Sequence, residues 1–93
     1  MLCTIIAFDK PGHLDLRMKT RPAHLEWMER ENVKATFIGP ILADDGTTPI
    51  GSLFVADFDS LAAAKAFHAR DPYSQAGLFD RVTVQPTRQV YPK

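Results

Sequence analysis

The order of the strand and helix signals constrains the fold of this chain more than any other feature. Residues 2–8 are mostly apolar and end at a Pro-Gly turn, which is typical of a strand. Residues 33–42 and 50–58 predict two further strands around the polar turn DDGTT. The stretch LFDRVTVQPT predicts a last strand, and its proline places that strand at an edge or a bulge. Helical spacing follows the first and the third of these strands.

The first helical segment covers residues 14–32 and contains a proline. Proline is best tolerated in the first turn of a helix, because it lacks the amide hydrogen that an interior position needs. We therefore expect a short lead-in, followed by a main helix that begins near Thr20 and holds Pro22 in its first turn.

The second helical segment, DSLAAAKAFHAR, begins at a cap formed by Asp59 or Ser60. It ends where Asp71 precedes a proline, because that proline disfavours the helical conformation for its predecessor. The following DPYSQAG predicts one extra helical turn, with Asp71 as N-cap and Gly77 as terminator.

These elements give the order βαββαβ, which predicts a single α+β domain over residues 1–93 with a ferredoxin-like antiparallel sheet and both helices on one face. The first strand is apolar on both of its alternating faces, yet helices can cover only one. The other face either packs against a second copy or offers an apolar ligand platform. A chain of 93 residues buries only about 60 to 65% of its unfolded surface, so we expect a homodimer.

The charge balance argues against two classes of partner. The charges of eleven basic and eleven acidic side chains cancel, so the chain has no excess of positive charge to attract nucleic acid or an anionic membrane. The stretch IGSLFVAD also lacks the aromatic residues and the basic residue that the RNA-recognition motif needs. The single cysteine, Cys3, lies in an apolar run without a basic leader, which favours a core role and a cytoplasmic protein.

Two residues stand out as candidates for proton-transfer chemistry. In RPAHLEWM, His24 shares a helix face with Trp27 and Met28, at the rim of an apolar stripe. It either donates to a backbone carbonyl or acts as a general base. Asp71 is explained by helix capping alone, but a capping carboxylate can also hold an imidazole and fix its tautomer.

Other candidates are weaker. If the hairpin turns about residues 45 and 46, Gly39 lies across from Gly51 or Ser52, which leaves either a hollow that a ligand can enter or a β-bulge that adjusts the twist. His13 is expected in solvent, and His68 at the end of its helix as a cation or a partly exposed packing residue. No two histidines have the spacing of a zinc site, so we expect no metal.

The segments RPAHL, GP, DDG, GS, DSLAAAKAF and DPYSQAGL together resemble the YciI-like (YCII-related) family, over almost the whole chain. The resemblance implies a dimeric α/β barrel, in which two ferredoxin-like units pack their sheets face to face. It also implies that His24 and Asp71 form an active-site dyad. One branch of the family resembles enzymes that remove hydrogen chloride from chlorinated hydroxyquinols.

Together these observations predict an enzyme without a cofactor that moves a proton on a small cyclic or aromatic hydroxyl compound, by elimination or isomerisation. His24 and Asp71 are the expected catalytic pair. The expected ligand-binding residues are an arginine for anionic oxygen, two hydroxyl groups and the GP dipeptide: Arg21, Ser52, Tyr73, Gly39 and Pro40. The alternative is a binding or accessory protein that holds a small molecule without turnover.

Overall fold

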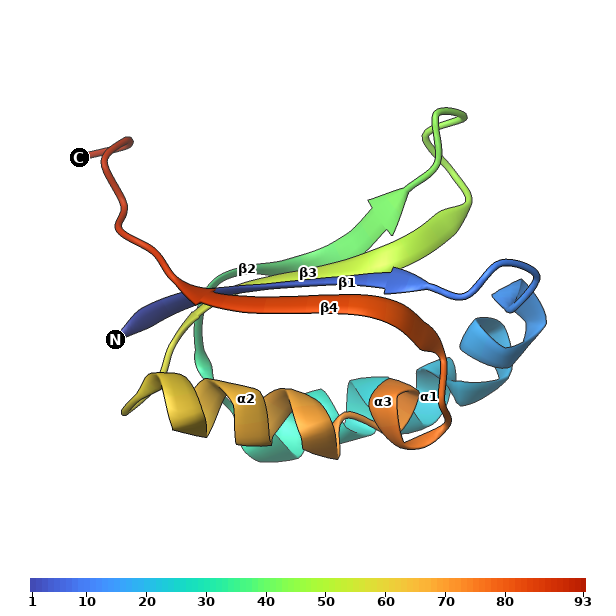
Figure 1. Cartoon of the computed structure of the whole chain (residues 1–93), viewed down its shortest axis with the longest axis horizontal. Helices are drawn as coiled ribbons and strands as arrows, with labels where there is room; N and C mark the ends of the chain where they lie inside the picture. Colours follow the sequence, from blue (N-terminus) through green and yellow to red (C-terminus); the bar gives the residue numbers. More distant parts are fainter.

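A computed structural model describes residues 1–93, and it contains a four-stranded antiparallel sheet with three helices on one side (Figure 1). The strand order is β2-β3-β1-β4. In chain order the elements are β1 (Leu2–Asp9), α1 (Leu14–Glu31), β2 (Lys34–Leu42), β3 (Pro49–Asp57), α2 (Leu61–Arg70), α3 (Pro72–Gln75) and β4 (Phe79–Pro86). The predicted ferredoxin-like arrangement is confirmed, and β4 lies at a sheet edge as its proline indicated.

The two central strands, β1 and β3, supply the side of the sheet that the helices cover. Cys3, Ile5 and Ala7 are fully buried on β1, and Ile5 pairs with Phe54 of β3. Side chains alternate between the faces of a sheet, so the remaining β1 residues point away from the helices. The core role expected of Cys3 is therefore confirmed.

The first helix differs from the expectation, because α1 is continuous from Leu14 to Glu31 and contains Pro22 in its interior. The expected break near Thr20 is wrong. Pro22 removes one backbone hydrogen bond, but it lies on the exposed side of the helix, where the freed carbonyl remains open to solvent. The helix ends at Asn32, whose left-handed backbone (φ 46°) is a common termination.

The second and third helices follow the predicted boundaries. The Ser60 side chain accepts a hydrogen bond from the backbone N–H of Ala63 and so caps α2. Together α1 and α2 bury Trp27 and Phe67 against Ile5 and Phe54, which forms the core cluster between helices and sheet. None of the three helices is both long enough and apolar enough to cross a membrane.

The other face of the sheet carries no helix (Figure 1). By the pairing register, this open face is formed by alternate residues of the strands. On β1, β2 and β3 most of them are apolar, whereas β4 contributes Arg81, Thr83 and Gln85. The apolar residues are Leu2, Ile6 and Phe8 on β1, Leu53 and Val55 on β3, and Phe37 and Ile41 on β2. The Phe37 side chain is 53% exposed. The loop between β2 and β3 and the segment after β4 both project to this side (Figure 1).

Candidate functional site

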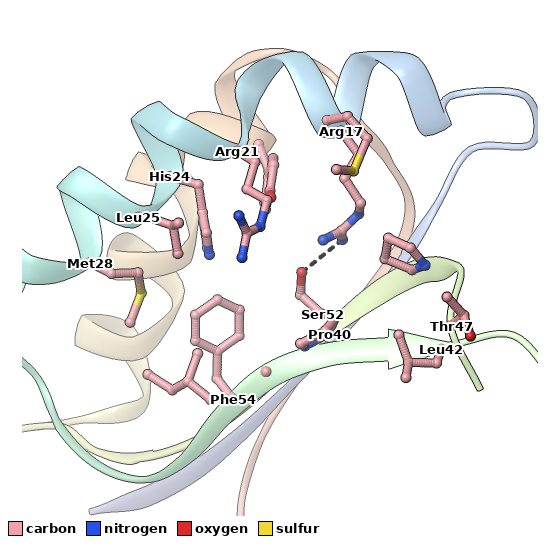
Figure 2. A pocket seen from close by; sticks show the side chains of 15 residues that line it. Arg17, Arg21, His24, Leu25, Met28, Pro40, Leu42, Thr47, Ser52 and Phe54 are labelled. Carbon is pink, nitrogen blue, oxygen red and sulfur yellow. Dashed lines mark hydrogen bonds between the residues drawn. The ribbon is translucent and has the colours of Figure 1, made fainter.

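The continuous α1 helix brings six side chains to a cavity between itself and the β2-β3 hairpin, and four of them follow one another along a single helix face (Figure 2). These four are Arg17, Arg21, His24 and Met28, spaced four, three and four residues apart, so they share one helix face. A helix that began near Thr20 would have left Arg17 outside the site. Its continuation through Pro22 therefore extends the site by a full turn.

His24 and Asp71 lie in direct contact. The Nδ1 atom of His24 is 2.9 Å from Oδ1 of Asp71, and the Asp71 side chain is fully buried. A carboxylate accepts but cannot donate, so Nδ1 carries the hydrogen and Nε2 is left free to accept one. Figure 2 shows the imidazole pointing from α1 into the cavity. The backbone carbonyl considered as the partner of His24 is not its partner here.

Asp71 also caps α3, as the sequence indicated. The same Oδ1 atom accepts the backbone N–H of Tyr73 at 2.9 Å, and Pro72 occupies the first helical turn. Capping and contact with His24 therefore coexist on one oxygen. The other oxygen, Oδ2, is buried without a hydrogen-bond partner.

The Tyr73 ring joins this pair to a second charged pair. It stacks on the His24 ring with centroids 4.2 Å apart, and the guanidinium carbon of Arg17 lies 4.5 Å from its centroid. Burial raises the pKa of the Tyr73 phenol above its ordinary value of 10. At neutral pH this hydroxyl is therefore protonated and able to donate.

Arg17 and Asp9 form the second pair, which the sequence analysis missed. Arg17 is 3% exposed; its Nε and Nη2 donate to the two Asp9 carboxylate oxygens at 2.7 and 2.9 Å. Nη2 also donates to Oγ of Ser52 at 2.9 Å. The signal that could have found Arg17 is its spacing from Arg21 and His24, which the expected helix break concealed.

The cavity has a volume of about 490 Å³, within the range of small-molecule sites. The predicted ligand-binding residues all line it, and apolar side chains make up about half of its 15 lining residues. Ser52 is buried, whereas Arg21 is exposed on α1 and directs its guanidinium group toward the cavity (Figure 2). The apolar lining comes from Met18, Leu25, Met28, Ile38, Leu42, Pro49 and Phe54.

The prediction that Gly39 lies across from Gly51 or Ser52 is wrong. Gly39 pairs with Leu53, and Ser52 pairs with Pro40 instead. The pairing shifts by one residue between Ile41 and Leu42, because a β-bulge adds a residue near the hairpin. Gly39 and Pro40 still border the cavity, but a hollow between paired glycines does not form.

His68 and His13 also differ from the expectations. His68 is buried, and its ring contacts Phe79 and Phe54. This burial lowers the pKa of His68 below 6.5, so the side chain is not the exposed helix-terminal cation that was considered. His13 is half-buried, with Nδ1 2.9 Å from the carbonyl oxygen of Pro11. No group of three or more His, Cys, Asp or Glu side chains is placed to hold a metal ion.

Comparisons with known proteins cover nearly the whole chain. Residues 1–88 match the YCII-related domain. The chain is 37% identical over 98 residues to protein YciI of Escherichia coli O6:H1, covering 98% of this chain and all of that protein. It is 36% identical over 99 residues to an uncharacterized protein of Haemophilus influenzae, with the same coverage.

Solved structures of similar fold include an enzyme with a bound ring compound. This is the 5-chloro-2-hydroxyhydroquinone dehydrochlorinase TftG of Burkholderia phenoliruptrix in complex with 2,5-dihydroxybenzoquinone. Its TM-score is 0.86 at 30% identity, over 95% of this chain and 94% of TftG. An antibiotic biosynthesis monooxygenase has a TM-score of 0.59 at 18% identity, over 97% and 99% of the two chains, which shows the shared fold alone.

Proposed function

Because the chain belongs to the YCII-related family, we propose that it is a proton-transfer enzyme whose base is the His24–Asp71 pair. Its substrate is a small cyclic or aromatic hydroxyl compound, and the reaction is an elimination or an isomerisation. The likeness to TftG, whose name describes a dehydrochlorinase, supports an elimination. The buried contact between His24 and Asp71 at the wall of an apolar cavity carries the proposal.

The fixed tautomer of His24 determines the direction of proton transfer. Asp71 holds the Nδ1 hydrogen, so Nε2 accepts a proton from a hydroxyl group or an acidic carbon of the substrate. As that bond breaks, an Nε2–H bond forms and the imidazolium cation is stabilised by the carboxylate. A base positioned in this way contributes about 10² to 10⁴ in rate.

The electron pair left on the substrate has two outcomes. In an elimination it forms a double bond while a leaving group such as chloride departs with its own bonding pair, so the net products are those of losing H⁺ and Cl⁻. In an isomerisation the imidazolium returns the proton to another atom. Arg21, Ser52 and Tyr73 are proposed to stabilise the negative oxygen that forms in either case.

Replacement of His24 tests this proposal. His24→Ala is expected to abolish chloride release from chlorinated hydroquinones and the change in ultraviolet absorbance that isomerisation of cyclic enols produces. The purified variant is expected to keep the circular dichroism spectrum of the wild type. His13→Ala, which removes an imidazole outside the cavity, is the matched control and is expected to keep activity. Turnover that survives in His24→Ala would refute the role. Saturable ligand binding without turnover, unchanged in His24→Gln, would instead indicate a binding protein.

We also propose that the open face of the sheet packs against a second copy of the chain, as a dimeric α/β barrel. The apolar side chains that β1, β2 and β3 present there support this. Leu53→Glu is expected to shift sedimentation toward a monomer, whereas Ala62→Glu, on the exposed side of α2, is not. Wild-type protein that sediments as a monomer at micromolar concentration would contradict the association.

A further inference from the structure

The start of α3 supplies both the hydrogen bond and the closest ring contact of His24. Asp71 meets the edge of the imidazole, with Oδ1 2.9 Å from Nδ1. Tyr73 covers one face, with the two ring centroids 4.2 Å apart and the ring planes inclined by only 19°. The other aromatic neighbours, Trp27 and Phe54, are tilted or edge-on, with centroids 6.0 and 6.4 Å away. One short segment therefore holds both an edge and a face of the imidazole.

These two contacts restrict different motions of the His24 ring. The terminal torsion of a histidine side chain has a broad energy minimum, so the ring twists easily about the bond that joins it to the rest of the side chain. A single hydrogen bond at Nδ1 fixes one edge but leaves much of this twist. A flat ring stacked on the face opposes it, because the imidazole would have to rotate into that ring. Edge and face contacts together therefore fix the direction in which Nε2 points.

Tyr73 is itself held firmly enough to serve as a support. Its backbone N–H donates to the Asp71 carboxylate at 2.9 Å, and the intervening Pro72 has a fixed φ angle. The side chain is only 2% exposed. Phe79 meets the Tyr73 ring edge-on, with centroids 6.1 Å apart and an angle of 81° between the planes. The phenol ring therefore has little room to move away from His24.

Arg17 closes the other face of the Tyr73 ring. Arg17 and His24 are seven residues apart on α1, which is about 10.5 Å along the helix axis. The Tyr73 centroid is 4.5 Å from the Arg17 guanidinium carbon and 4.2 Å from the His24 centroid, so the phenol ring fills the gap between them. Figure 2 shows both α1 side chains extending toward the sheet. Hydrogen bonds to Asp9 and Ser52 fix the guanidinium group in turn.

We propose that Tyr73 is a positioning residue for His24, whose ring face fixes the plane of the imidazole while Asp71 fixes its tautomer. The ring alone provides this role, which is separate from the one proposed for the Tyr73 hydroxyl. The inference rests on the proposed function in taking His24 as the base. The plane matters for such a base because a displacement of about 1 Å costs roughly 100-fold in rate.

Carbon-13 relaxation of the His24 ring, in the whole 93-residue chain, tests this role without a substrate. The order parameter that it yields is about 0.85 for a rigid group and below about 0.6 for a flexible one. We expect about 0.85 in the wild type and below about 0.6 in Tyr73→Leu, which removes the ring but keeps an apolar side chain. Tyr73→Phe keeps the ring without the hydroxyl and is expected to retain about 0.85.

Two controls separate this effect from general loosening of the core. The first is the buried ring of His68, which contacts Phe54 and Phe79 and forms no ring pair with Tyr73. It is expected to keep its order parameter in Tyr73→Leu. The second is Phe79→Leu, which removes a ring that touches Tyr73 but forms no ring pair with His24. In this variant the His24 ring is expected to stay rigid.

A flexible His24 ring in the wild type, or a rigid one in Tyr73→Leu, would overturn the inference. So would a Tyr73→Phe ring as flexible as that of Tyr73→Leu, or equal loosening of His24 and His68. If Tyr73→Leu does not fold, Tyr73→Met repeats the test with a flexible side chain that fills the same space.

The outcome is distinguishable from that of the proposed function. A His24 ring held by Tyr73 in a protein that turns over no substrate would support this inference and refute the enzyme. Turnover that depends on His24, in a protein whose His24 ring is flexible, would do the reverse.

Discussion

Arg17→Met is expected to destabilise the protein severely, although the sequence analysis did not single out Arg17. The substitution keeps much of the apolar volume but removes a guanidinium group that bonds both Asp9 oxygens and Ser52. The side chains of Arg17 and Asp9 are only 4% and 7% exposed, so the Asp9 carboxylate would be left buried without its partner. Such a change costs about 3 to 5 kcal/mol.

Thermal and urea denaturation, followed by circular dichroism, measure this loss. For a chain of this length it corresponds to a fall in Tm of about 12 to 40 °C. The double variant Asp9→Asn with Arg17→Met is expected to recover much of the loss, because no buried charge is left unpaired. The matched control is Arg30→Met, whose partner Glu26 is exposed and whose pair is worth less than about 0.5 kcal/mol. An Arg17→Met protein as stable as Arg30→Met would refute the reasoning.

Two further predictions concern packing and pH. In Gly51→Ala the added methyl group would clash with the Ala7 carbonyl oxygen, so a loss of about 1 to 3 kcal/mol in the free energy of unfolding is expected by urea denaturation. Gly39→Ala meets only the Phe37 ring and should lose less; equal losses would contradict this account. Burial lowers the pKa of His68 in the folded protein. As the pH drops below about 6.5, the unfolded chain therefore takes up the His68 proton before the folded protein does. The free energy of unfolding is expected to fall over this range, until the pH has passed the lower pKa of the folded state. In His68→Phe the urea midpoint should depend less on pH between about 7.5 and 5, and an unchanged slope would contradict the assignment.

The fold was predictable because its local signals agree with one another. The strand boundaries fall within about one residue of those expected, and the caps at Ser60 and Asp71 are where polar residues precede helical patterns. The first helix was mispredicted because the cost of an interior proline depends on its surroundings. Pro22 faces outward, and that orientation is not visible until the packing of α1 is known.

The site was predictable only where neighbouring residues specify it. His24 and Asp71 were named from local pattern and from the family resemblance, but their 2.9 Å contact depends on how α1 meets the start of α3. The Arg17–Asp9 pair was missed because it joins a strand end to a helix whose start was misplaced. The position of Gly39 was misjudged by one residue because a β-bulge leaves no clear mark in the sequence.

The account depends most on the tautomer of His24, which nitrogen-15 NMR of the imidazole measures directly. In the wild-type protein near neutral pH, the neutral ring is expected to carry its hydrogen on Nδ1 and to leave Nε2 bare. In Asp71→Asn, which keeps a cap oxygen for Tyr73 but loses the charge, the hydrogen is expected to shift toward Nε2. A wild-type ring protonated on Nε2, or a tautomer that is the same in both proteins, would contradict the proposal that Asp71 prepares His24 to accept a proton in the cavity.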